Sequence, residues 1–279
     1  MRPPTQPPLS LTVRPSAPAL ALLIGAMGYA ATRFAHTAEL ALPTGGAQLL
    51  VNLDRDALTS TPLRCARRST PGAAVLGPFT GPAVIDPAQQ AAVVWVAFRP
   101  AGPGPFLPVP VGEVRDELAG LGDLWGADGA VLRERLLEAV AAGGPRAALR
   151  TLETVLLERA RTPPAPDPAI RRVALLLDRG VPVAEVADRL GGTPRRLARR
   201  CAGELGVPPK RYARVRRFQR LLRRVNAGQP PPDWAALAVD CGYHDQAHLI
   251  HEFRAHAGIT PGAYAPRSPR EGNHVPLPG

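Results

Sequence analysis

Cysteine and lysine are scarce in this sequence of 279 residues. The three cysteines, Cys65, Cys201 and Cys241, are far apart and form no CxxC or zinc-finger spacing. An odd number of isolated cysteines argues against a disulfide-stabilised scaffold and favours a reducing compartment. We therefore expect a cytoplasmic protein.

Motifs that carry catalysis are also missing. The sequence has no GxSxG, no phosphate-binding loop and no HExxH, and only His36 precedes residue 166 among the histidines. We expect a protein that is not an enzyme and needs no cofactor. A thiol sensor or alkyl acceptor at Cys65 is one alternative, because Arg64, Arg67 and Arg68 surround it, although an ordinary cysteine in a basic turn has the same pattern.

Long apolar runs are absent except near the start of the chain. Between Arg14 and Arg33 lie 18 uncharged residues, of which 12 are strongly apolar, and the stretch contains Pro15 and Pro18. A membrane span needs about 20 apolar residues. A signal peptide or a membrane-tethered regulator is the alternative, but a buried strand or helix fits the run better, so we expect no membrane partner.

Arginine is abundant, and its distribution along the chain is uneven. Residues 1–166 carry 15 basic and 13 acidic side chains, whereas residues 167–270 carry 19 basic and 9 acidic ones, a net charge of +10. Between Arg195 and Arg224 there are 12 basic residues and one acid, Glu204. Such a concentration is typical of a polyanion-binding domain, and a solvated arginine-rich surface is the alternative.

The N-terminal half changes from a strand pattern to a helix pattern. Short apolar runs at 47–53 and 91–98, bounded by Gly and Pro, predict strands. Apolar residues at three- and four-residue spacing predict helices at 132–140 and 148–158, separated by GlyGlyPro at 143–145. These two helices could form a dimer seam or cover the sheet.

The sequence therefore predicts a multi-domain protein. Its N-terminal domain is expected to be β-rich α+β, of a kind that includes the cupins, and its C-terminal domain all-α. The expected divisions are an N-terminal domain at 1–160, a Pro-rich linker at 161–168, a strongly basic C-terminal domain at 169–266 and a disordered tail at 267–279.

Residues 183–212 and 234–264 are two copies of one pattern. At an offset of 51, Val183, Val186, Ala187, Leu190 and Gly191 match Trp234, Leu237, Ala238, Cys241 and Gly242. At an offset of 52, Leu197, Cys201, Gly206, Val207, Pro209 and Tyr212 match Leu249, Phe253, Gly258, Ile259, Pro261 and Tyr264. Each copy predicts a helix, a glycine turn and a second helix, which is the helix-turn-helix motif.

Local signals mark where these helices begin and end. Gly191 and Gly242 stand where a first helix must stop, because glycine tolerates positive φ. Thr193, followed by Pro194, and Asp245 are good N-caps for the second helices.

A longer helix is predicted at 209–226 between the two copies. Its apolar face carries Tyr212, Val215, Phe218, Leu221, Leu222 and Val225. Its other faces carry Arg211, Arg214, Arg216, Arg217, Arg220, Arg223 and Arg224. We expect this connector to set two recognition helices in adjacent grooves and its arginines to contact DNA phosphates. A helical bundle that only mediates protein contacts is the alternative.

The repeat resembles the double helix-turn-helix domain of AraC-type transcription regulators. The resemblance covers about 95 residues and is closest over 238–264. More weakly, residues 75–82, 97–107 and 121–126 resemble an N-terminal sensing domain of that family. The resemblance implies sequence-specific binding to double-stranded DNA, with two recognition helices in adjacent major grooves. It also implies an N-terminal domain that binds a small-molecule effector, forms a homodimer or does both, and RNA polymerase as a partner if the protein is an activator.

In the first recognition helix Leu197 and Cys201 face the core, so Arg195 and Arg199 point outward. Arginine suits bidentate contact with guanine, whereas the flanking Arg196 and Arg200 suit phosphates. The residues expected at DNA in this unit are Thr193, Arg195, Arg196, Arg199 and Arg200.

In the second recognition helix Leu249 and Phe253 are core. The residues expected at DNA are Gln246, Ala247, Ile250, His251 and Arg254. Gln246 can read adenine, and Ala247 or Ile250 can touch a thymine methyl. The family more often has a small hydroxyl residue and an arginine where Ile250 and His251 stand, so this helix is less basic than is usual.

Three histidines in the same unit raise a metal-binding alternative. His244, His248 and His251 have the spacing to share one helix face, as zinc ligands would. No cysteine or carboxylate completes such a site, and we expect no metal.

Overall fold

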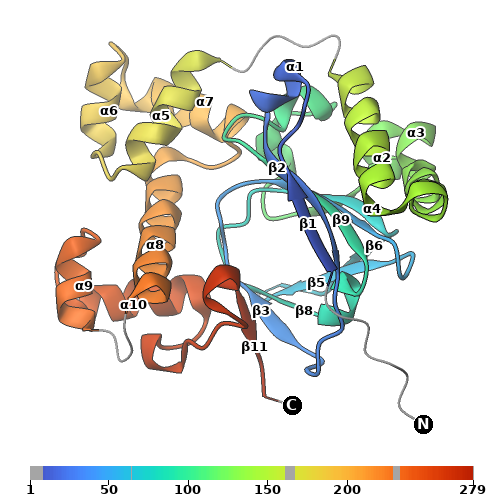
Figure 1. Ribbon diagram of the computed structural model, residues 1–279. Helices are drawn as coiled ribbons and strands as arrows, with labels where there is room; N and C mark the ends of the chain where they lie inside the picture. Colours follow the sequence, from blue (N-terminus) through green and yellow to red (C-terminus); the bar gives the residue numbers. More distant parts are fainter. Residues whose placement is uncertain (1–8, 64, 161–166, 229–232, 279) are drawn as a thin grey trace.

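The computed structural model describes residues 9–63, 65–160, 167–228 and 233–278. Figure 1 shows a β-rich N-terminal domain beside a column of helices formed by the C-terminal domain. The predicted fold class, a β-rich α+β domain followed by a helical one, is confirmed.

Two antiparallel sheets build the N-terminal domain. The six-stranded sheet has the order β1 (Leu9–Val13), β2 (Ile24–Ala31), β9 (Val93–Phe98), β4 (Gln48–Asn52), β7 (Ala73–Leu76) and β10 (Leu118–Gly120). The five-stranded sheet has the order β11 (His274–Pro276), β3 (Glu39–Ala41), β8 (Ala83–Ile85), β5 (Leu58–Pro62) and β6 (Arg68–Thr70). The predicted strands at 47–53 and 91–98 are β4 and β9, paired in the centre of the larger sheet.

Helices cover one face of the larger sheet. They are α1 (Pro18–Ala21), α2 (Leu121–Trp125), α3 (Ala127–Ala130) and α4 (Leu132–Arg159). Helix α4 contains a break at Gly143 and Gly144, whose backbone is not helical, so the two predicted helices and the predicted break are confirmed. Short 3-10 turns complete the domain: η1 (Pro87–Gln90), η2 (Gly104–Phe106) and η3 (Val111–Val114).

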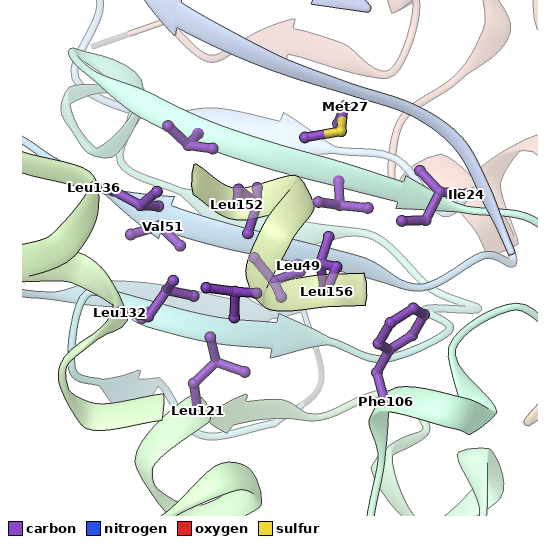
Figure 2. Close-up of a cluster of buried hydrophobic side chains, with 14 of the residues drawn as sticks. Ile24, Met27, Leu49, Val51, Phe106, Leu121, Leu132, Leu136, Leu152 and Leu156 are labelled. Atoms are coloured by element: carbon purple, nitrogen blue, oxygen red, sulfur yellow. The ribbon is translucent and has the colours of Figure 1, made fainter. Parts of the chain in front are cut away.

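The apolar face of α4 packs on the sheet. Leu132, Leu136, Leu152 and Leu156 are fully buried among strand residues (Figure 2). The two roles left open for these helices were to form a dimer seam or to cover the sheet. The buried residues of α4 cover the sheet.

The apolar run near the start of the chain forms α1 and β2, with Leu20, Ile24 and Met27 fully buried. This outcome agrees with the predicted buried strand or helix. In the described ranges, no helix has the length and apolar character needed to cross a membrane.

The C-terminal domain is helical from residue 168 onward. Its helices are α5 (Pro168–Asp178), α6 (Val183–Arg189), α7 (Pro194–Glu204), α8 (Pro209–Ala227), α9 (Trp234–Asp240) and α10 (Gln246–Ala257), followed by the 3-10 turns η4 (Pro261–Ala263) and η5 (Pro269–Glu271). Most of the predicted linker, residues 161–166, lies outside the described residues.

The tail corrects a prediction. Residues 267–279 were expected to be disordered because they are rich in proline, yet β11 pairs with β3 of the N-terminal domain. Val275 is buried with Leu40 and Leu42 in the core that also contains Phe218 and Phe253 of the second helix-turn-helix unit. The tail is ordered because Val275 is buried and because β11 pairs with β3.

Candidate nucleic-acid interface

The first helix-turn-helix unit consists of α6 and α7. Gly191 takes the left-handed conformation between them, with φ of 61°. The Thr193 hydroxyl accepts a hydrogen bond from the Arg196 backbone N–H at 3.3 Å, as a helix cap should. Leu197 and Cys201 are buried, which turns the opposite face of α7 outward.

The second unit consists of α9 and α10. Gly242 again has a positive φ, 78°, and the Asp245 carboxylate accepts a hydrogen bond from the His248 N–H at 2.7 Å. That hydrogen bond is the largest cause of the lowered pKa of Asp245. Leu249 and Phe253 are fully buried. The predicted caps and core positions of both units are confirmed.

Most of the predicted contact residues lie on the surface. The exposed ones are Thr193, Arg195, Arg196, Arg199, Gln246, Ala247, His251 and Arg254. Ile250 is half-buried against the core of its unit. Arg200 differs from its neighbours because it pairs with Asp167 and lies 3.5 Å from Glu204, so in this structure its charge is used inside the domain.

The connector α8 has the predicted buried face and a set of paired arginines. Its buried face is as expected, with Tyr212, Val215, Phe218, Leu221 and Leu222 in the core. Most of its arginines have a partner within the protein. Arg214 and Arg217 form ion pairs with Glu252. Arg216 and Arg223 form ion pairs with Asp178, and Arg220 donates a hydrogen bond to the Asp178 backbone carbonyl. Arg211 lies 3.9 Å from Asp116.

Glu252 anchors α10 on this connector. It is only 6% exposed, and both of its oxygens accept hydrogen bonds from Arg214. Burial raises the pKa of Glu252, but the hydrogen bonds and charge of Arg214 outweigh burial, so the pKa lies below its ordinary value. The carboxylate is therefore charged at neutral pH and fixes α10 against α8.

His256 completes this buried contact. Its ring stacks on Phe218 with centroids 5.3 Å apart, and its Nδ1 lies 2.8 Å from the Glu252 carbonyl oxygen. Burial lowers the pKa of His256, which keeps the imidazole neutral at physiological pH.

Helix α8 also contacts the N-terminal domain directly. Gln219, 7% exposed, donates to the Pro43 carbonyl at 2.8 Å and to the Asn273 side chain at 2.7 Å. Arg216 donates to the Thr44 carbonyl at 3.2 Å. The connector is therefore fixed between the two recognition units and the N-terminal sheet.

The histidines of the second unit are not arranged as ligands. His244 Nδ1 lies 2.9 Å from Asp245, and the His244 backbone N–H donates to His248 Nδ1. Across the described ranges, no group of three His, Cys, Asp or Glu side chains could hold a metal ion.

Sequence reasoning missed Asp178 and Glu252, which organise the arginines of α8. A signal existed: they are two of the few acids in a strongly basic region, and few acids must neutralise many arginines when the helices pack. Their pairing partners could not be read, because Arg214 and Glu252 are 38 positions apart.

A comparison with known protein families finds a match to this part of the chain. The family model described as a helix-turn-helix domain matches residues 186–267, a span that includes α7 and α10. Residues 186–267 are thus similar to helix-turn-helix domains of the AraC type. The resemblance stated from the sequence is thus confirmed for this part of the chain, and a helix-turn-helix domain of this type belongs to DNA-binding transcription regulators.

Whole-chain comparisons add distant similarities to the helix-turn-helix domain match. An apo variant of ToxT from Vibrio cholerae is 12% identical, with 94% of this chain and 98% of that chain covered and a TM-score of 0.46. ToxT bound to an unsaturated fatty acid is 10% identical, with 95% and 96% covered and a TM-score of 0.43. No curated protein matches the sequence.

Proposed function

We propose that this chain is a sequence-specific transcription regulator that places α7 and α10 in adjacent major grooves of double-stranded DNA. One observation carries the proposal. Each recognition helix starts with a capped first turn whose outward side chains are exposed, and both helices are packed on the connector α8. Two such helices fixed on one rod would read sites about 34 Å apart, one turn of DNA.

The exposed residues suggest a division of roles. Arg195 and Arg199 of α7 would contact guanine, and Gln246 of α10 would contact adenine. Arg196 and Arg254 would contact phosphates and supply salt-dependent affinity. Arg200 and the α8 arginines would act indirectly, by holding the helices in place.

The N-terminal domain would sense an effector, mediate a homodimer or do both. Its connection to α8 through Pro43, Thr44 and Gln219 supports this role, because a change near residues 43–45 would reach the rod that carries both recognition helices. RNA polymerase would be a further partner if the protein activates transcription.

The test is selection of bound duplexes from a random DNA library by the full chain and by Arg195→Ala/Arg199→Ala. A matched control is Arg146→Ala/Arg150→Ala, which removes the same charge from exposed positions of α4. We expect a motif of two half-sites for the full chain and the control, with preference lost at one half in the α7 variant. Binding without any motif, or an unchanged motif in the α7 variant, would contradict the proposal.

A further inference from the structure

An arginine-lined pocket lies where the N-terminal domain meets α5 and α8. Its volume is about 520 Å³, within the range of small-ligand sites. Arg99 and Pro100, which follow β9, form one wall, whereas α5 and the first half of α8 form the others. The pocket thus includes residues of both domains.

Positive charge dominates this pocket. Four arginines line it (Arg99, Arg171, Arg172 and Arg216), and Asp178 is the only acid among its lining residues. Asp178 is already paired with Arg216 at 2.7 Å. Within the described part of the chain, no ion pair or hydrogen bond engages the side chain of Arg171 or Arg172. The lining residues therefore leave a formal charge of +3 uncompensated.

The largely buried residue Tyr212 also lines the pocket. Tyr212 is 3% exposed, and its hydroxyl has no hydrogen-bond partner among the described residues. Burial is the largest cause that raises the pKa of Tyr212 to about 12, so the hydroxyl stays protonated and can donate.

Arg99 is already oriented for such a role. Its Nε donates to the carbonyl oxygens of Ala21, at 2.9 Å, and Ile24, at 3.3 Å. These bonds fix the plane of the guanidinium at the pocket wall. A pre-oriented guanidinium loses less entropy when it binds an anion.

We propose that this pocket binds a small phosphorylated molecule, a phosphate monoester whose phosphoryl group meets Arg99, Arg171, Arg172 and Tyr212. A carboxylate brings a single charge and would leave two of the three free arginines uncompensated. A phosphate monoester brings about −1.5 to −2 charges and three acceptor oxygens, which arginine forks match well. The remaining volume, beside Pro100 and Leu175, accommodates the organic part.

The binding site itself does not depend on the proposed function, whereas its regulatory consequence does. A ligand held by Arg99 on one domain and by α5 and α8 on the other would favour the domain arrangement seen here. It would therefore change DNA affinity by stabilising one orientation of the recognition helices.

The test is titration calorimetry of the full chain without DNA. The probes are inorganic phosphate, ribose 5-phosphate and adenosine monophosphate, with ribose and adenosine as unphosphorylated controls. We expect binding of phosphorylated probes only, weakened at least about tenfold by Arg171→Gln/Arg172→Gln and several-fold by Tyr212→Phe. The matched variant Arg146→Gln/Arg150→Gln, with the same loss of charge on α4, should bind as the native chain does.

Three results would overturn the proposal. They are no binding of any phosphorylated probe, equal weakening by the pocket variant and the α4 variant, and a larger loss of DNA affinity than of probe affinity in Arg171→Gln/Arg172→Gln. The last result would show that the arginines of the pocket bind DNA phosphates rather than a small ligand. A chain that binds the probes but selects no DNA motif would refute the proposed function and leave this site intact.

Discussion

Arg214 of α8 holds Glu252 of α10 through two parallel hydrogen bonds, Nε to Oε2 at 2.9 Å and Nη2 to Oε1 at 2.8 Å. This pair joins the connector to α10, and Glu252 is almost fully buried.

Glu252→Gln should therefore lower the free energy of unfolding. It weakens hydrogen bonds to a charged partner and leaves Arg214 poorly matched, which costs about 2 kcal/mol. The control is Glu185→Gln, which breaks an exposed pair with Arg189 and should cost less than about 0.5 kcal/mol. Urea denaturation measures both, and equal losses would show that the Glu252 pair contributes no more than a surface pair.

The free energy of unfolding should depend on pH through Glu39. This residue is fully buried at the edge where the tail joins β3. Burial raises the pKa of Glu39, but the hydrogen bond and charge of His274, with help from His36 and Arg267, outweigh burial and hold the pKa below its ordinary value of 4.5. A carboxylate with a lowered folded pKa adds stability above its unfolded pKa, and that stability is lost as pH falls through the folded value.

The expected result is a free energy of unfolding that decreases as pH falls below about 4.5, with a shallower decrease in Glu39→Gln. Denaturation in urea across this pH range measures the slope. Glu138→Gln, on the exposed side of α4, is the control and should keep the slope of the native chain. Identical slopes for native chain and Glu39→Gln would remove Glu39 from the acid response.

The three cysteines should differ in reactivity. Cys65 is exposed, whereas Cys201 and Cys241 are buried in the cores of the two helix-turn-helix units. Burial raises the pKa of Cys201 to about 12 and raises that of Cys241 as well, which suppresses the reactive thiolate. A thiol reagent followed by mass spectrometry should label Cys65 alone in the folded protein, and Cys65→Ser should remove this label. Rapid labelling of Cys201 without denaturant would show that the first unit opens readily.

Gly112 should be sensitive to substitution because η3 packs closely on α7. A Cβ at Gly112 would lie 2.4 Å from the Ala202 carbonyl oxygen, so Gly112→Ala must push α7 away from the N-terminal domain. We expect a loss of about 1–3 kcal/mol.

Gly203, one residue from Ala202 and inside α7, is the matched control for Gly112. A Cβ there meets nothing within 4 Å, so Gly203→Ala should stabilise the helix by up to about 1 kcal/mol. Thermal unfolding compares the two variants. A neutral Gly112→Ala would mean that the contact between η3 and α7 adjusts without cost.

The sequence predicted the helix-turn-helix units well because their signals are local. Gly191, Thr193 and Asp245 each determine a turn or a cap within four residues, and the apolar spacing places Leu197 and Phe253 in the core. Strands β4 and β9 were also recognisable, since their short runs of apolar residues are bounded by Gly and Pro.

Contacts between distant segments could not be predicted in this way. Phe98, Phe106 and Trp125 come from separate segments, yet they are packed in one core of the N-terminal domain. The partners of the α8 arginines and of the tail cannot be read from the sequence near them. Arg216 donates to the Thr44 carbonyl and His274 contacts Glu39, and each pair is separated by most of the sequence. Composition describes how a segment behaves alone, and these segments are ordered by their partners.

The position of strand β11 affects how the protein folds during synthesis on the ribosome. Residues 274–276 close the edge of a sheet whose next strand, β3, is made more than 230 residues earlier. Until β11 emerges, the backbone groups of β3 on that side remain open to other strands, which is a hazard during synthesis. A strand translated after the helix-turn-helix domain therefore protects one of the first strands, and the N-terminal sheet is complete only when that domain has been made.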